Sequence, residues 1–200
     1  MPVARLILAS TSRYRKEMLE RLRLPFDTVS PEVDETAHAG ETPEALALRL
    51  ALEKARAVAV RYPGRVVIGA DQVATVDGLS LGKPGSHERA VAQLQHLSGR
   101  EVAFHSALCV TDGRRDEVVD VVTTCRFRTL SAQEIDVYLH AERPYDTAGS
   151  AKAEGLGIAL MDSMHSDDPT AIIGLPLIAL ARMLRSFDLN PLSGAAMLAS

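Results

Sequence analysis

Residues 65–76 of the chain read RVVIGADQVATV, and this stretch decides how the rest of the fold is read. Its β-branched residues predict a strand, interrupted by Gly69, Ala70 and Asp71. The dipeptide Asp77-Gly78 follows and indicates a hairpin turn. Asp71 is the anomaly, because an acid inside an apolar strand needs a partner, a metal or a catalytic role. On the pattern alone, a structural role such as accepting hydrogen bonds from a turn stays equally open.

Strands and helices alternate on both sides of this stretch, which predicts an α/β fold with a mixed sheet. On the N-terminal side we expect a strand at 3–9, a helix capped by Ser10 or Ser12, a strand at 26–30 and a helix at 43–61 capped by Thr42. On the C-terminal side we expect a helix at 86–97, paired strands at 101–110 and 118–129, a helix opened by a Ser131–Glu134 capping box, a strand at 158–161 and a final helix ending near Phe187.

The composition fits one globular domain, which we place at residues 1–190 with a tail at 191–200. A net charge of −4 gives no general support for nucleic-acid binding, which usually needs a broad basic surface. The apolar run at the N-terminus is too short for a signal peptide or a membrane span. Cys109 and Cys125 have no nearby metal-ligand partner. We therefore expect a cytoplasmic protein with reduced, buried thiols, no nucleic-acid partner and no membrane partner.

Four polar clusters lie at the ends of the expected elements, where functional groups are often displayed. Residues 10–15 (STSRYR) enter a helix, where hydroxyls, amides and arginines either bind an anion or simply cap the helix. Residues 32–35 (EVDE) form an acidic loop that suits Mg²⁺ or Mn²⁺, or only solvent. Asp71 is the third, and residues 149–155 (GSAKAEG) are the fourth. This last loop lacks Walker spacing, and the chain has no nucleophile elbow and no HExxH zinc signature.

Read together, these clusters resemble the Maf family, the nucleotide pyrophosphatases first associated with septum formation. The matching stretches occur in family order and span about Leu6 to Leu184, nearly the whole chain. They are LILASTSRYRKEML, EVDE, LALEKA, VVIGADQV, GKP, HLSG, AGSAKAEGLG and IIGLPL. No single stretch is decisive, but so many matching stretches in the same order make coincidence very unlikely.

The resemblance implies an elongated α/β fold of the Maf and ITPase-like kind. Its mixed sheet would carry helices on both sides, with two lobes around a central cleft, and the protein would form a homodimer. The activity implied is a cleavage between the α- and β-phosphates that depends on a divalent metal, Mg²⁺ or Mn²⁺. The products would be a nucleoside monophosphate and pyrophosphate.

The resemblance also assigns roles to individual residues. Asp71 matches the family's catalytic aspartate, described as the proton acceptor. The other matches contact phosphate or support the metal and catalysis. The expected catalytic set is Asp71, Glu35, Lys54 and Lys83, with Asp71 and Glu35 as metal ligands and Ser10, Ser12 and Arg15 as phosphate-binding residues.

Three positions distinguish branches of the family with different bases, and here they read Tyr14, Gln72 and Glu154. This combination is similar to the branch that acts on 7-methyl-GTP, whereas the dTTP/UTP branch usually has Arg, Thr and Gln. The methylated guanine ring is cationic and should stack on Tyr14. Glu154 would accept hydrogen bonds from the guanine N1–H and N2–H₂ edge. Arg13 and Tyr14 stand where the family often has Pro and Trp.

Two alternatives to a 7-methyl-GTP pyrophosphatase stay open. One is the same chemistry on another nucleotide, either dTTP and UTP or a broad housecleaning range. The other is a nucleotide-binding regulator of septum formation that needs no turnover. The full acid-and-base set around Asp71 favours catalysis, because a pure binder has no need of it.

Overall fold

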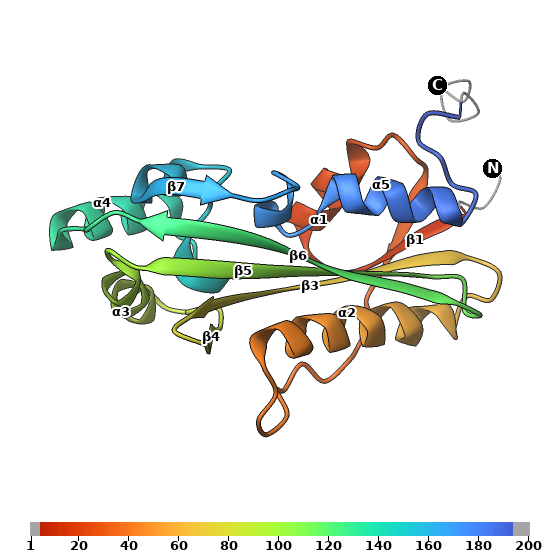
Figure 1. Cartoon of the computed structure of the whole chain (residues 1–200), viewed down its shortest axis with the longest axis horizontal. Coiled ribbons are helices and arrows are strands. Elements are labelled where there is room, and N and C mark those ends of the chain that lie inside the picture. Colours follow the sequence, from red (N-terminus) through yellow and green to blue (C-terminus); the bar gives the residue numbers. More distant parts are fainter. Residues whose placement is uncertain (1–4, 194–200) are drawn as a thin grey trace.

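The computed structural model describes residues 5–193. They form a mixed seven-stranded sheet in the order β2-β1-β3-β5-β6-β7, with β4 paired to β3 as well (Figure 1). The pairs β1–β2 and β1–β3 are parallel, and the other pairs are antiparallel. The elements are β1 (Leu6–Ala9), α1 (Arg13–Glu20), β2 (Phe26–Val29), α2 (Pro43–Ala59), β3 (Val66–Val76), β4 (Leu79–Leu81), α3 (His87–Leu97), β5 (Glu101–Thr111), β6 (Asp116–Phe127), α4 (Ala132–Glu142), β7 (Met161–His165) and α5 (Leu177–Ser186).

This architecture confirms the predicted α/β class and most of the predicted elements. The start of the strand expected at 3–9 and the end of the tail expected at 191–200 lie outside the described residues. Ser12 rather than Ser10 caps α1, and Thr42 caps α2. The Ser131–Glu134 capping box is present at the start of α4. The helix starts are therefore set by hydrogen bonds between a capping side chain and backbone amides a few residues away.

The expected interruption of β3 at Gly69 to Asp71 is wrong. β3 runs without a break from Val66 to Val76, and its register against β5 is continuous from Val67 to Thr75. Gly69 serves close packing instead. A β-carbon at this position would lie 2.1 Å from the carbonyl oxygen of Ala51 in α2 and 2.6 Å from the nitrogen of Ala55, so only glycine fits.

The strand expected at 158–161 is also misplaced. Residues Leu156–Leu160 form a 3₁₀ turn, and β7 begins only at Met161. The chain coils tightly here because Gly157 packs on the backbone of Lys152, where a β-carbon would lie 2.5 Å from the Lys152 carbonyl oxygen. This contact between two backbone segments leaves no periodic trace in the apolar sequence.

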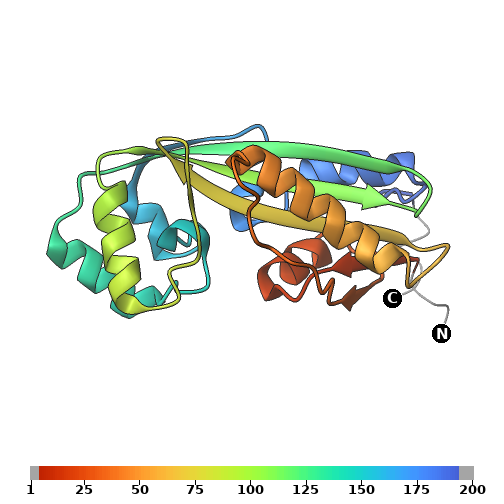
Figure 2. The same cartoon turned by 90° about the horizontal axis from the view of Figure 1, so that it is seen from below.

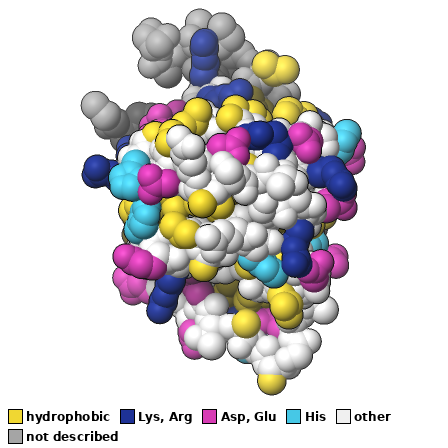
Figure 3. All heavy atoms as spheres, turned by 90° about the vertical axis from the view of Figure 1, so that its left-hand side faces the viewer, with side chains coloured by type: hydrophobic (Ala, Val, Ile, Leu, Met, Phe, Trp, Pro, Cys, Tyr) yellow, Lys and Arg dark blue, Asp and Glu magenta, His cyan; other side chains and the backbone are white. Residues whose placement is uncertain are grey.

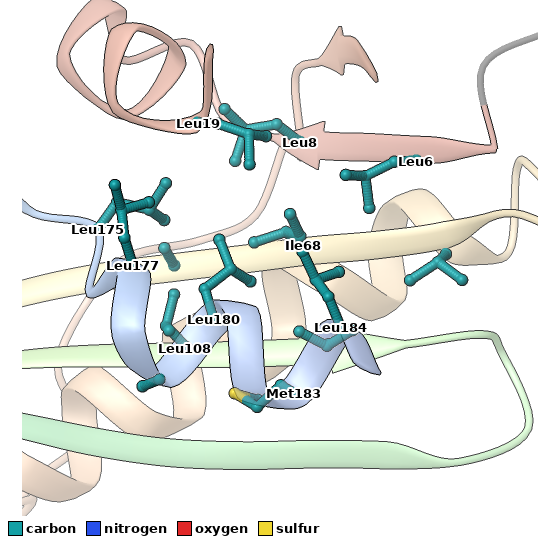
Figure 4. Close-up of a cluster of buried hydrophobic side chains, with 14 of the residues drawn as sticks. Leu6, Leu8, Leu19, Ile68, Leu108, Leu175, Leu177, Leu180, Met183 and Leu184 are labelled. Carbon is teal, nitrogen blue, oxygen red and sulfur yellow. The ribbon is translucent and has the colours of Figure 1, made fainter. Parts of the chain in front are cut away.

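The core forms three clusters around the long central strands. Side chains alternate along a strand, so the even-numbered residues of β3 share one face of the sheet. Near the start of β3 this face packs against α1 and α5, as Figure 4 shows for Ile68, Leu180 and Leu184. Near the end of β3 the same face packs against α3 and α4. The opposite face is covered by α2. Helices therefore cover both faces, as predicted.

These clusters build two lobes along the sheet (Figure 2). One lobe holds β1, β2, α1, α2 and α5, and the other holds α3, α4, β4 and β7. The end formed by α3 and α4 shows basic and acidic side chains interspersed on its surface (Figure 3).

Cys109 and Cys125 are buried free thiols, and burial raises the pKa of each to about 12. No helix within residues 5–193 is both long enough and apolar enough to cross a membrane.

Candidate active site

A gap in the pairing of β3 opens the cleft between the lobes. β5 covers one edge of β3 along nearly its whole length. On the other edge, β1 pairs only as far as Gly69 and β4 only from Ala74. The edge of residues 70–73 thus faces a cleft of about 640 Å³ that both lobes line. Asp71 and Gln72 are consecutive residues whose side chains point to opposite faces of the sheet. Because the strand edge is open here, both side chains reach the cleft.

On the face covered by α2, a lysine joins two carboxylates. Lys54 Nζ in α2 lies 2.7 Å from Asp71 Oδ1 and 2.6 Å from Glu35 Oε1. Lys54 and Asp71 are buried, with 4% and 7% of their surface exposed, whereas the Glu35 side chain is 58% exposed. Buried charges are tolerated when they are paired, so each of the two buried groups depends on the other. The partner that the odd acid in the apolar strand required is Lys54.

Gly69 makes this ion pair possible. It precedes Asp71 by two residues, so both face α2. The absence of a side chain at Gly69 lets the backbone of α2 approach the strand at Ala51 and Ala55. Lys54 lies on the same stretch of α2, which brings its ammonium to Asp71.

Glu35 is held in its ionised form by the cations of the site. Partial burial would raise its pKa, but the hydrogen bond and charge of Lys54, with the charges of Lys83 and Arg15, outweigh burial and lower the pKa. Its neighbour Asp34 turns away and accepts hydrogen bonds from the amide and hydroxyl of Thr36. Of the acidic loop, only Glu35 therefore joins the site.

The N-terminus of α1 forms another wall of the cleft. Ser12 Oγ accepts from the amide of Arg15, and Ser10 Oγ accepts from the amide of Ser12. Arg15 donates from Nε to the carbonyl oxygen of Gly174 at 3.1 Å. Burial lowers the pKa of Arg15, while the charges of Asp71 and Glu35 oppose that shift. An arginine stays protonated even so, and the wall presents hydroxyls, amides and a guanidinium to an anion.

On the other face of β3, Gln72 donates hydrogen bonds to neutral groups. Its Nε2 lies 3.0 Å from Ser106 Oγ, 3.1 Å from the carbonyl oxygen of Ala171 and 3.0 Å from that of Ile172. Ile172, Ile173 and Gly174 line the cleft, so Gln72 fastens this segment to the sheet. We call residues 171–174 the lip.

Tyr14 and Glu154 face the cleft from opposite lobes, Tyr14 on α1 and Glu154 in the loop after α4. The guanidinium of Arg13 lies over the Tyr14 ring, 4.9 Å from its centroid, and so takes up part of the stacking surface. In the loop around Glu154, Lys152 does not line the cleft, and its Nζ donates instead to the carbonyl oxygen of Glu142. Of this loop's acid and base, the cleft therefore receives only the acid.

Every site residue expected from the sequence lines this one cleft: Ser10, Ser12, Tyr14, Arg15, Glu35, Lys54, Asp71, Gln72, Lys83 and Glu154. The sequence analysis did not predict Asp146 and Thr147, which lie in an irregular loop without a sequence pattern. It also assigned no role in the site to the motif IIGLPL, which contains most of the lip. No group of three or more His, Cys, Asp or Glu side chains poised for a metal occurs among residues 5–193. Asp71 and Glu35, the metal ligands expected from the sequence, share Lys54 and both line the cleft.

Comparisons with known proteins show which family the chain resembles. Residues 5–187 match the family described as Maf-like protein. The 7-methyl-GTP pyrophosphatase of Bordetella avium (strain 197N) is 70% identical over 188 residues, 94% of this chain and 95% of that protein. The protein of the same name from Bordetella pertussis (strain Tohama I) is 68% identical over 190 residues, 95% of this chain and 96% of that one. The solved structure of the Staphylococcus aureus Ham1 protein has a TM-score of 0.46 and 17% identity, over 62% of this chain and 72% of that one.

Proposed function

The chain belongs to the Maf-like protein family, and on this premise we propose that it hydrolyses 7-methyl-GTP to 7-methyl-GMP and pyrophosphate. The observation that carries the proposal is the position of Asp71: a buried carboxylate, paired with Lys54, on the open edge of β3. The names of the relatives that are 70% and 68% identical support the choice of nucleotide.

The cleft can hold a triphosphate because three of its cations lie near enough to Glu35 to lower its pKa. Arg15, Lys54 and Lys83 line it together with the N-terminus of α1. A nucleoside triphosphate carries about four negative charges, and fixed cations and amides of this kind stabilise charge that moves onto a leaving pyrophosphate. Lys83 is exposed, so it can follow the phosphates as they move, whereas Lys54 is fixed by its two carboxylates.

In this proposal Asp71 accepts a proton from the attacking water. In the proposed step the water oxygen bonds to the α-phosphorus, and the bond from that phosphorus to the bridging oxygen of the β-phosphate breaks. The electron pair leaves with pyrophosphate, and the water proton passes to the Asp71 carboxylate. Lys54 Nζ donates to Asp71 Oδ1 at 2.7 Å and so helps to hold the carboxylate in place.

The donor set also fits a divalent cation. Mg²⁺ and Mn²⁺ prefer oxygen ligands, and Mg²⁺ is commonly bound by one or two carboxylates together with substrate phosphates. Asp71 and Glu35, which share Lys54, are the residues that would hold it. Bound there, the cation would offset phosphate charge and polarise the α-phosphate.

Base selection would come from Tyr14 and Glu154, which line the cleft from opposite lobes. Tyr14 offers a ring face to the cationic 7-methylguanine, although Arg13 covers part of it. Glu154 offers a carboxylate from the opposite lobe for the N1–H and N2–H₂ donors of the guanine edge. The homodimer implied by the family resemblance and the cytoplasmic location expected from the cysteines and the N-terminal segment stay predictions.

The test is a pyrophosphate-release assay on the purified chain, with and without Mg²⁺ or Mn²⁺, across 7-methyl-GTP, GTP, dTTP, UTP and CTP. We expect metal-dependent release of pyrophosphate and the highest kcat/KM on 7-methyl-GTP. A highest kcat/KM on dTTP or UTP would place the chain in the other branch. Tight nucleotide binding without any turnover would favour the regulator of septum formation.

A further inference from the structure

The amide of Gln72 has a fixed orientation. Two of the three oxygens around its Nε2 are the backbone carbonyls of Ala171 and Ile172, which accept hydrogen bonds and cannot donate. If the amide turned over, its own oxygen would face these carbonyls at about the same short distance. The nitrogen must therefore point to the lip, and the oxygen Oε1 must point the other way.

Gln72 Oε1 keeps access to the cleft. The buried side-chain atoms without a hydrogen-bond partner in residues 5–193 belong to Arg65, Thr75, Asp120 and Thr123, so Oε1 is not a sealed atom. It lies next to Gly174 in the lip, where a β-carbon, if present, would be 3.9 Å away. Because Gly174 carries no side chain, nothing from this position covers the oxygen.

Ser106 is the side chain that completes this arrangement. It lies opposite Gln72 in the β3–β5 ladder and is fully buried. Its Oγ accepts from Gln72 Nε2 at 3.0 Å and donates to the carbonyl oxygen of Ala171 at 2.8 Å. Ser106 does not line the cleft, so it can influence a bound nucleotide only through Gln72 and the lip.

We infer that Ser106 is a positioning residue for base selection, which holds Gln72 so that Oε1 faces the base as a hydrogen-bond acceptor. The inference rests on the proposed pyrophosphatase function. Without Ser106 the two carbonyls still accept from Nε2, but the hydroxyl that joins the amide to Ala171 is lost, so Gln72 is held less firmly and should discriminate less well. A fixed acceptor favours a base edge rich in N–H donors, such as that of guanine, and leaves a base with carbonyls there poorly paired.

The test measures the ratio of kcat/KM for 7-methyl-GTP to that for UTP in a double-mutant cycle. Ser106→Ala should lower the ratio about 3- to 10-fold, the range expected for one neutral hydrogen bond, mainly through KM for 7-methyl-GTP. Gln72→Met should lower it at least as much. In the Gln72→Met background, Ser106→Ala should change the ratio no further, since it acts through Gln72.

Thr123→Val is the matched control. Thr123 is a fully buried hydroxyl residue on the neighbouring strand β6, and its Oγ1 has no hydrogen-bond partner within the described residues. The control should leave the ratio unchanged. If Ser106→Ala does not fold by thermal melting, Ser106→Cys, a weaker donor of similar size, replaces it and should lower the ratio by a smaller factor.

Two outcomes overturn the inference: an unchanged ratio in Ser106→Ala, or an equal fall in the wild-type and Gln72→Met backgrounds. Failure of the proposed substrate is a separate result. If the wild-type chain prefers another nucleotide, the cycle is run on its best and second-best nucleotides. Coupling between Ser106 and Gln72 in that ratio would then support the positioning role of Ser106. The proposal that 7-methyl-GTP is the substrate would be wrong.

Discussion

At the open edge of β3, the neighbouring residues Asp71 and Gln72 point to opposite faces of the sheet and meet different kinds of partner. Asp71 leaves the strand toward α2 and meets charges, Lys54 and through it Glu35. Gln72 leaves it toward the lip and meets neutral donors and acceptors, Ser106 and two carbonyls. A charged pair suits the handling of phosphate, whereas a fixed neutral amide suits the reading of a base edge. The comparison separates chemistry from selection, and each prediction below tests that separation.

The largest effect is expected on the charged face. Asp71→Asn keeps the shape of the side chain but removes the proton acceptor, so kcat should fall by about 10²- to 10⁴-fold on every nucleotide. The ratio between nucleotides should stay the same. Pyrophosphate release in the steady state measures both quantities, with a thermal melt to show that the variant is folded. Near-normal turnover would remove Asp71 from the mechanism.

Gly69→Ala should disturb the same face through the backbone. The new β-carbon would lie 2.1 Å from the carbonyl oxygen of Ala51, so α2 must move away and Lys54 with it. Overpacking of this kind typically costs about 1 to 3 kcal/mol of stability, and kcat should fall on all nucleotides. Urea denaturation measures the loss.

A second substitution shows which contact is responsible. Adding Ala55→Gly to Gly69→Ala removes one methyl from the clash but leaves the Ala51 carbonyl in place. The double variant should therefore recover little stability. Full recovery would mean that the side chain of Ala55, and not the approach of the helix backbone, limits this position.

Glu154→Gln should act on selection alone. It replaces a carboxylate with an amide that is a weaker partner for the N–H donors of a cationic guanine. The ratio of kcat/KM for 7-methyl-GTP to that for UTP should fall about 3- to 10-fold, with kcat on UTP little changed. Glu101→Gln, an exposed acid away from the cleft, is the control. An unchanged ratio would exclude Glu154 from base recognition.

The smallest effect concerns pH. The pKa of Glu35 is lowered in the fold, because the cations of the site outweigh its partial burial. Its contribution to stability should be complete above the ordinary glutamate pKa of about 4.3 and should be lost as the pH falls through the lowered value. Since the side chain is 58% exposed, the contribution should not exceed about 1 kcal/mol.

Thermal melts of the wild type and of Glu35→Gln between pH 7 and pH 3 measure this contribution. The difference in Tm should be constant in the upper part of the range and shrink in the lower part. Ser106→Ala on the neutral face should show a Tm difference from the wild type that does not depend on pH. A Glu35→Gln difference that grows as the pH falls would contradict the assignment.

Most of the fold could be predicted from the sequence because it depends on local chemistry. Ser12, Thr42 and Ser131 cap helices through contacts within a few residues, and the Asp77-Gly78 turn fixes the β3–β4 hairpin. The two errors, the supposed break at Gly69 and the strand expected at 158–161, both fall where a glycine lets backbone pack closely, Gly69 against α2 and Gly157 against the nearby Lys152. Neither contact shows in the apolar periodicity of the sequence.

The sequence by itself determined that Asp71 is an acid in an apolar strand and that an ordered set of Maf-like stretches surrounds it. Only the tertiary structure decided which residue pairs with Asp71 and which residue holds the side chain of Gln72. Lys54 reaches Asp71 from α2, and Ser106 reaches Gln72 from β5. Both contacts join residues far apart in the chain, and they depend on the packing of α2 and on the register of β5, which no short stretch of sequence encodes.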